Sequence, residues 1–279
     1  MIGRRIAKGL CGFATAASLL GAASTLSAAA APMTVGNIRI EYAEPKDPAF
    51  RDLAETLKKA RALEYVQTIL GAIRLPRTLT VKLADCGGVS NAWYANDELR
   101  VCYEYVAAIY KDSADHDLPI GISREDTIIG PLLDVFLHES GHAVFDYLDV
   151  PIFGREEDAA DQFSTFIMLR YDKERARRLI LGSAYQYRMA VKEPKLAMNV
   201  TKFADEHGLA AQRFFNVLCT AYGSDPDLFA DLVKNGFLPA LRAAGCEDEY
   251  RQTEKAFRKL ILPHVNQAAA RKALKRREH

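Results

Sequence analysis

The sequence His138-Glu139-Ser140-Gly141-His142 lies in a segment, Leu132 to Leu148, whose apolar residues have the spacing of a helix. Histidines four residues apart lie on one face of a helix, so their imidazoles can bind a single metal ion. Glu139 is then placed to take a proton from a water at the open position of the metal. The flanking residues 135–137 and 143–145 are uncharged. The sequence therefore predicts a metal site in an apolar part of the protein from which water is largely excluded. The alternative is that both histidines are buried core residues with hydrogen-bond partners.

A catalytic zinc site usually has three protein ligands, so a third must come from another segment. Phe145 and Leu148 occupy the positions where the metzincin motif continues with glycine and histidine. After a helix break at 150–154, an acidic segment opens a second helix, which can fold back antiparallel to the first. Within it, Glu157-x-x-Ala160-Asp161 resembles the second signature of gluzincin metallopeptidases.

This resemblance implies that Glu157 is the third zinc ligand, beside His138 and His142. It also implies that Asp161, one turn later, accepts a hydrogen bond from the other ring N–H of a ligand histidine. Glu156 and Asp158 stay open as alternative ligands, because acidic residues are favoured in the first turn of any helix.

Longer stretches resemble a bacterial family of exported metallopeptidases, a domain of unknown function. These stretches are Cys102-Tyr-Glu104, His138–His142, Gly154–Gln162, Asp205-Glu-His207 to Gln212-Arg213, and Tyr222–Pro226. The resemblance covers most of the chain after its N-terminal segment. It supports Zn²⁺ as the cofactor but implies no particular substrate.

The periodicity of apolar residues predicts an α+β fold with a small mixed sheet and a mostly helical C-terminal half. The resemblance to gluzincin metallopeptidases implies that this fold is zincin-like. Strands are expected at 33–42, 78–84, 92–94 and 99–105, with a turn at 95–97, and one helix from 48 to about 70. Further helices are expected at 127–148, 155–171, 173–190, 205–222, 226–244 and 247–260. We expect one domain over 32–265, followed by a basic tail, 266–279, that forms a solvated helix end.

The N-terminal residues 1–31 have basic residues, then a short apolar stretch, then small residues, as in a Sec-type signal peptide. An uncleaved N-terminal anchor is the alternative. The predicted location is therefore periplasmic or secreted, with no membrane span after cleavage. The 279 residues carry a formal net charge of +1, which gives no reason to expect nucleic acid as a partner. The sequence does not predict an oligomeric state.

Four cysteines remain after the N-terminal segment, an even number that suits disulfides in an exported protein. Of the three possible pairings, we favour Cys86 with Cys102 and Cys219 with Cys246, because each pair closes a short local loop. A four-cysteine zinc site is the alternative, although no pair has C-x-x-C spacing.

Substrate contacts are predicted at two places. Asn91-Ala92-Trp93-Tyr94 resembles the edge-strand segment with which thermolysin-like enzymes bind an extended peptide, or it is a hairpin anchored by its tryptophan. His207 is the candidate for stabilising the oxyanion, because Asp205 could orient its imidazole. Arg213, Tyr185 and Tyr187 are the alternatives for that role.

Together these features predict an exported zinc metallopeptidase of gluzincin type that acts on peptide or protein substrates, with Glu139 as general base. A zincin fold kept as a non-catalytic binding or scaffold protein is one alternative. A zinc hydrolase of a non-peptide amide or ester is the other.

Overall fold

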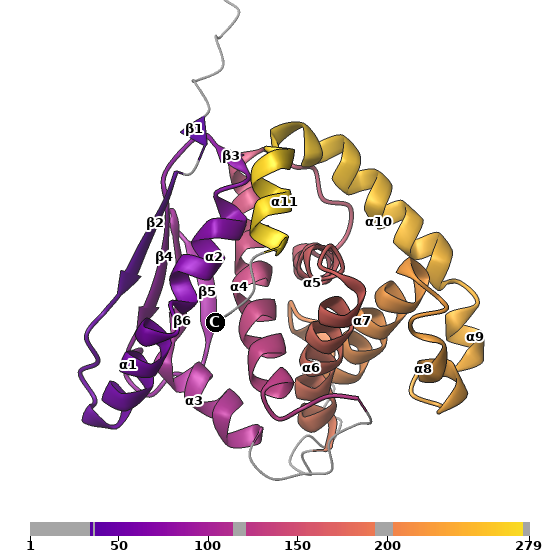
Figure 1. Cartoon of the computed structure of the whole chain (residues 1–279), viewed down its shortest axis with the longest axis horizontal. Helices are drawn as coiled ribbons and strands as arrows, with labels where there is room; N and C mark the ends of the chain where they lie inside the picture. Colours follow the sequence, from indigo (N-terminus) through magenta and orange to yellow (C-terminus); the bar gives the residue numbers. More distant parts are fainter. Residues whose placement is uncertain (1–33, 36, 114–120, 193–202, 276–279) are drawn as a thin grey trace, which may run out of the picture. The chain divides into compact units, whose positions relative to one another are not determined.

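The computed structural model describes residues 34–35, 37–113, 121–192 and 203–275. The predicted signal peptide lies outside these residues. The described residues form an α+β fold in which a small sheet and its helices precede a mostly helical C-terminal half, as expected and compatible with a zincin-like architecture. Helix α4 (Asp126–Tyr147) lies between the sheet and the later helices (Figure 1).

The main sheet has four strands among the described residues, in the order β2-β4-β6-β5. The strands β2 (Ile38–Tyr42), β4 (Leu79–Ala84) and β6 (Glu98–Cys102) are parallel, and β5 (Ala92–Ala95) pairs antiparallel with β6 at the edge. A second ladder pairs β1 (Thr34–Val35) with β3 (Arg74–Leu75). The predicted turn between β5 and β6 is present, and Asn96 and Asp97 both have positive φ, as a two-residue hairpin requires.

Two expectations for this half are wrong. The last strand was expected to reach residue 105, but it ends at Cys102 and Tyr103 begins α3 (Tyr103–Asp112). Tyr103 is fully buried, and its hydroxyl donates to the carbonyl of Ala43, while Val106 and Ile109 continue a helical apolar face. The alternation of residues 99–105 therefore spans the end of a strand and the first turn of a helix.

The single helix expected from residue 48 is divided into a 3₁₀ turn η1 (Pro48–Phe50), α1 (Arg51–Lys59) and α2 (Ala62–Leu70). The break falls at Arg61, which has a φ of 57°. Because the chain changes direction there, α2 buries Leu63, Val66 and Leu70, whereas α1 buries only Leu57.

The C-terminal half contains α5 (Glu156–Met168), α6 (Lys173–Lys192), α7 (Ala210–Ser224), α8 (Ala230–Lys234), α9 (Ala240–Ala243), α10 (Cys246–Leu260) and α11 (Gln267–Lys275), with a 3₁₀ turn η3 (Leu262–His264). The helix expected over 226–244 is instead the two short helices α8 and α9. Gly236, with a φ of 75°, and Pro239 stand between them. The segment expected as a solvated tail contains α11, which packs near α2 and buries Ala273.

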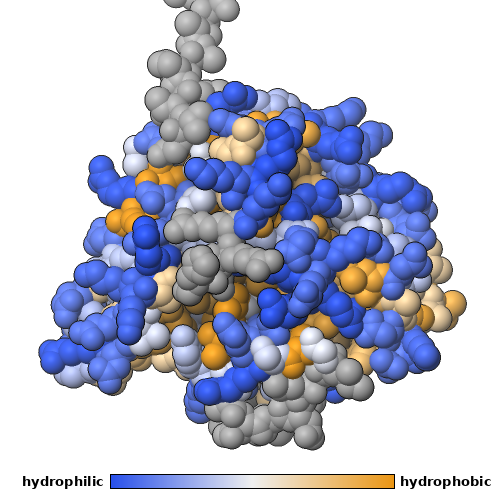
Figure 2. All heavy atoms as spheres, in the orientation of Figure 1, coloured by the Kyte–Doolittle hydropathy of each residue, from blue (hydrophilic) through white to orange (hydrophobic). Residues whose placement is uncertain are grey.

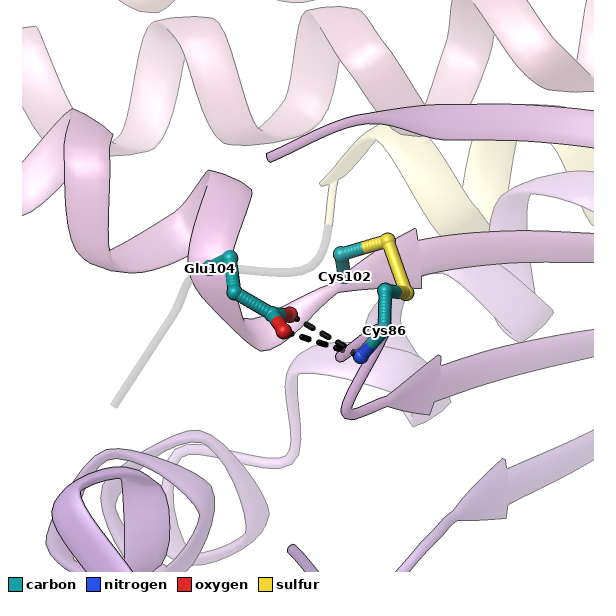
Figure 3. Close-up of side chains that lie close together, drawn as sticks. All are labelled: Cys86, Cys102 and Glu104. Atoms are coloured by element: carbon teal, nitrogen blue, oxygen red, sulfur yellow. Dashed lines mark hydrogen bonds between the residues drawn. A yellow bond between two sulfur atoms is a disulfide. The ribbon is translucent and has the colours of Figure 1, made fainter. Parts of the chain in front are cut away.

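Both predicted disulfides are present. Cys86–Cys102 joins the loop after β4 to the end of β6, and Cys219–Cys246 joins α7 to α10. Glu104 accepts hydrogen bonds from the backbone N–H of Cys86 and of Gly88, so the first disulfide lies in a hydrogen-bonded loop (Figure 3). Two disulfides indicate an oxidising compartment.

The surface of the described residues is mixed in character, and the face in Figure 2 shows hydrophilic side chains interspersed with small apolar areas. Phe153 and Leu241 are the most exposed large apolar side chains of this part of the chain. Of the helices described, none is both long and apolar enough to span a bilayer.

The position of α4 depends on close contacts at glycines. Gly130 faces Gly182 of α6, and a Cβ on Gly130 would lie 2.7 Å from the carbonyl oxygen of Leu179. A Cβ on Gly182 would overlap the backbone carbonyl of Asp126. On another face, Gly141 is so close to α5 that a Cβ there would lie 3.2 Å from the Cα of Ala160. Glycines therefore allow α5 and α6 to pack closely against α4.

We expect Gly182→Ala to lower the free energy of unfolding by about 1–3 kcal/mol or more, because the added methyl group meets backbone that cannot rotate away. Urea denaturation followed by circular dichroism measures the change. Gly245→Ala is the matched control, since its Cβ would have only the Glu249 carboxylate nearby, at 3.7 Å. If the unfolding free energy fell by the same amount in both variants, a methyl group at the α4–α6 crossing would cost no more than one at an uncrowded glycine.

Candidate metal centre

The turn between α4 and α5 places the two motifs opposite each other. Asp149 and Gly154 have positive φ, and they reverse the chain between the two helices. The close approach at Gly141 and Ala160 then lets side chains near the start of α5 reach the face of α4 that carries the histidines.

Three potential ligand atoms converge at this crossing. Nε2 of His138 lies 2.9 Å from Oε2 of Glu157, and Nε2 of His142 lies 3.5 Å from the same oxygen. The two Nε2 atoms are 3.3 Å apart. His138, His142 and Glu157 form a group whose ligand atoms all lie within 4.8 Å of one another and could hold a metal ion. In the described part of the chain, the other such group is Cys86, Cys102 and Glu104, where the sulfur atoms form a disulfide (Figure 3).

Each histidine has a carboxylate on its other ring nitrogen. Nδ1 of His138 lies 2.8 Å from Oδ1 of Asp161, and Nδ1 of His142 lies 2.7 Å from Oε1 of Glu156. With a proton on each Nδ1, both Nε2 atoms keep a free lone pair toward Glu157. Asp161 and Glu156 thus lie on the sides of the two imidazoles that face away from the shared Glu157 oxygen.

The alternative ligands are both directed elsewhere. Glu156 contacts His142 from the Nδ1 side, which the sequence analysis did not foresee. Its position directly before Glu157 at the helix start was the only available signal. Asp158 pairs with Arg155 at 2.8 Å.

Glu139 is buried next to the ligand group, with only 7% of its surface exposed. Burial raises the pKa of its carboxyl group, although the neighbouring imidazoles oppose this shift. A carboxylate with a raised pKa is better matched to taking up a proton near neutral pH than an ordinary surface glutamate.

A pocket of about 300 Å³ opens beside His138 and Glu139. Its lining is Asn91, Ala92, Tyr105, Asp134, Val135, His138, Glu139, Gln186, Tyr187, Ala190, His207, Gly208, Ala210 and Arg213. The predicted substrate residues Asn91 and Ala92 are thus beside the histidine motif, at the edge strand β5. Tyr185 is not in this lining; it is buried on α6, and its hydroxyl has no hydrogen-bond partner among the residues that the structure describes.

His207 is also brought to the centre. Its Nε2 lies 2.9 Å from Oε2 of Glu157, and its ring stacks on that of His138 with centroids 5.9 Å apart. Its backbone N–H donates to Oδ1 of Asp205, which lies 3.4 Å from Nδ1 of the ring. The helix expected over 205–222 begins only at Ala210, so His207 lies in the segment that leads into α7.

Arg213 and Tyr187, the alternatives to His207 as donor, have other partners. Arg213 donates from Nε and Nη2 to the two oxygens of Asp161, at 2.8 and 2.6 Å. The hydroxyl of Tyr187 donates to Asp134 at 3.1 Å. All three candidates line the pocket, and His207 likewise has a partner, since its Nε2 faces Glu157.

The charges of the centre are strongly coupled. Burial opposes a charge on His138, but its hydrogen bonds to Asp161 and Glu157 outweigh burial and raise its pKa to about 10. Burial likewise opposes the ionisation of Glu157, but hydrogen bonds from His138, His142 and His207 hold its pKa far below the usual range. Without a metal, protons therefore supply the positive charge that these carboxylates need.

Comparison with known proteins gives one family. A family model described as "Putative metallopeptidase" matches residues 42–261. No curated protein and no solved structure gives a significant match.

The raised pKa of His138 predicts a pH dependence for the metal-free protein. The imidazolium stabilises the fold fully below its ordinary pKa of 6.5, and this contribution is lost as the pH rises through about 10. We expect the difference in unfolding free energy between wild type and His138→Gln, measured with urea in a chelator, to shrink from pH 6 to pH 10. A difference that stays constant across this range would mean that His138 is neutral in the metal-free fold.

Proposed function

Since the chain belongs to the metallopeptidase family whose model spans residues 42–261, we propose that it is an exported zinc metallopeptidase of gluzincin type. The observation that carries this proposal is the convergence of His138, His142 and Glu157 beside a buried glutamate and a pocket.

The donor set fits zinc. Two imidazole nitrogens and one carboxylate oxygen form the ligand set of many catalytic zinc sites, which keep a further position open. The carboxylates on both Nδ1 atoms support this assignment, because such partners fix the tautomer in which Nε2 is free to coordinate.

Zn²⁺ bound by these residues supplies a Lewis acid that polarises a carbonyl and lowers the pKa of a water. Glu139 takes the proton of the attacking water and delivers it to the leaving amine. His207, oriented by Asp205, donates a hydrogen bond to the developing oxyanion.

The edge strand supports a peptide or protein substrate. Strand β5 has β6 on one side, and its beginning, Ala92, lines the pocket beside Glu139. On its other side β5 pairs with no strand of the described residues. There an extended peptide can add to the sheet, with the side-chain amide of Asn91 bonding a substrate carbonyl.

Export is proposed from the N-terminal segment, with cleavage near residues 29–31 and a mature domain over 32–265. The two disulfides support a periplasmic or secreted location, since such bonds persist in oxidising compartments.

Metal content tests the ligand set. We expect about one zinc per chain in purified wild type by elemental analysis, lost or greatly reduced in Glu157→Ala, because two histidines alone hold the ion weakly. Asp158→Ala is the matched control: it removes a carboxylate from the same turn of α5, but one that pairs with Arg155. No zinc in wild type, even after incubation with the metal, would reject the peptidase proposal.

Turnover tests the general base. With dye-labelled casein and a mixed peptide library as probes, we expect Glu139→Gln to retain zinc but lose activity by about 10²–10⁴-fold. Cleavage of neither probe by zinc-loaded wild type would favour a scaffold protein or a hydrolase of non-peptide bonds. Equal activity in both proteins would exclude Glu139 as the base.

A further inference from the structure

Arg213 lines the pocket, and its guanidinium is also bound to a carboxylate of the metal centre. Its guanidinium donates to both oxygens of Asp161, and its side chain is 19% exposed against 10% for Asp161. This two-pronged pairing depends on the planar fork of arginine, which lysine cannot reproduce.

Through Asp161, this contact reaches a predicted zinc ligand. Oδ1 of Asp161 receives both Nη2–H of Arg213 and Nδ1–H of His138. The orientation of His138 therefore depends on the rotamer of Asp161, and Arg213 determines that rotamer. Among the hydrogen bonds of the described residues, those of Arg213 go to Asp161 and not to His138 or Glu157.

The other side of Arg213 is held as well. Its guanidinium lies over the ring of Tyr187, 4.7 Å from the ring centre, and the hydroxyl of Tyr187 donates to Asp134. Asp134 also accepts from Ser183 of α6, at 2.5 Å, and from Ser164 of α5. Helices α4, α5, α6 and α7 are thus joined in one buried polar network that begins and ends on α4, one turn apart, at Asp134 and His138.

We propose that Arg213 is a positioning residue for the metal centre: its fork keeps Asp161 turned toward Nδ1 of His138, and the Asp134–Tyr187 pair keeps that fork in place. This inference rests on the proposed zinc ligands. Buried carboxylates need such partners, since burying a charged group without hydrogen bonds costs free energy.

The direction in which zinc affinity changes distinguishes a positioning role of Arg213 from a purely electrostatic effect of its charge. Removing a cation close to a divalent ion relieves repulsion, so charge alone would make Arg213→Gln bind zinc more tightly and leave Arg213→Lys unchanged. Positioning predicts weaker binding in both variants, by about 10- to 100-fold.

The experiment is a chelator-competition titration of Zn²⁺ with wild type, Arg213→Lys and Arg213→Gln at fixed pH. Arg155→Gln is the matched control, because Arg155 is a cation of the same neighbourhood whose ion pair in the described part of the chain is with Asp158, at the surface. We expect both Arg213 variants to be weakened, the Arg155 control to match wild type, and the visible bands of the Co²⁺-loaded Arg213→Lys protein to be shifted. Wild-type affinity in Arg213→Lys, or tighter binding in Arg213→Gln, would overturn the proposal.

A second pair of variants tests the same network if the Arg213 variants do not fold. Tyr187→Phe removes only the hydroxyl that holds Asp134, and we expect it to weaken zinc binding several-fold. Tyr105→Phe removes another hydroxyl of the pocket, one that accepts from Gln186, and should leave zinc affinity unchanged. Equal affinity in Tyr187→Phe and wild type would count against the network. If wild type itself binds no zinc, the proposed function fails, whereas tight wild-type binding with unaffected variants rejects the positioning role alone.

Discussion

The close packing of α4 on both of its sides is the constraint on which the rest of this structure depends. The helix supplies Phe136, Val144 and Phe145 to the core under the sheet, and Leu133 and Leu137 to the core among the later helices. Because Gly141 allows α5 to approach it so closely, Glu157 and Asp161 of α5 reach the two ring nitrogens of His138. A looser helix would leave the histidines without their carboxylates, whatever the sequence of the motif.

The same packing buries several ionisable groups of the centre, and burying a charge costs free energy. Asp134, His138, Glu139 and Asp161 are all buried, and buried charges are tolerated only when they are paired or hydrogen-bonded. Here each of the two aspartates has several donors, and the imidazoles and carboxylates stabilise one another. His138, His142 and Glu157 form a group that could hold a metal ion, and the charge of such an ion would replace the protons that otherwise balance these carboxylates.

Local features of the sequence predicted much of this. The histidine motif, the strand at 78–84, the hairpin at 95–97 and both disulfides depend on short-range spacing, which a single sequence displays. The start of α3 was missed because Tyr103 and Tyr105 continue an alternating pattern into a helix. The pairing of Arg213 with Asp161 joins residues 52 positions apart, and no spacing rule connects them. Glu156 was considered as a ligand, yet only the direction in which α5 approaches α4 decides that it contacts the far side of His142.

Strand β5 is short, which limits how much of another chain can pair with its edge. A strand of four residues is about 13 Å long, so it can form a ladder with only three or four residues of another chain. Such an edge offers little backbone for a second copy of the protein to pair with, since short edge strands limit edge-to-edge pairing. It suits a short extended segment, such as the peptide proposed as substrate.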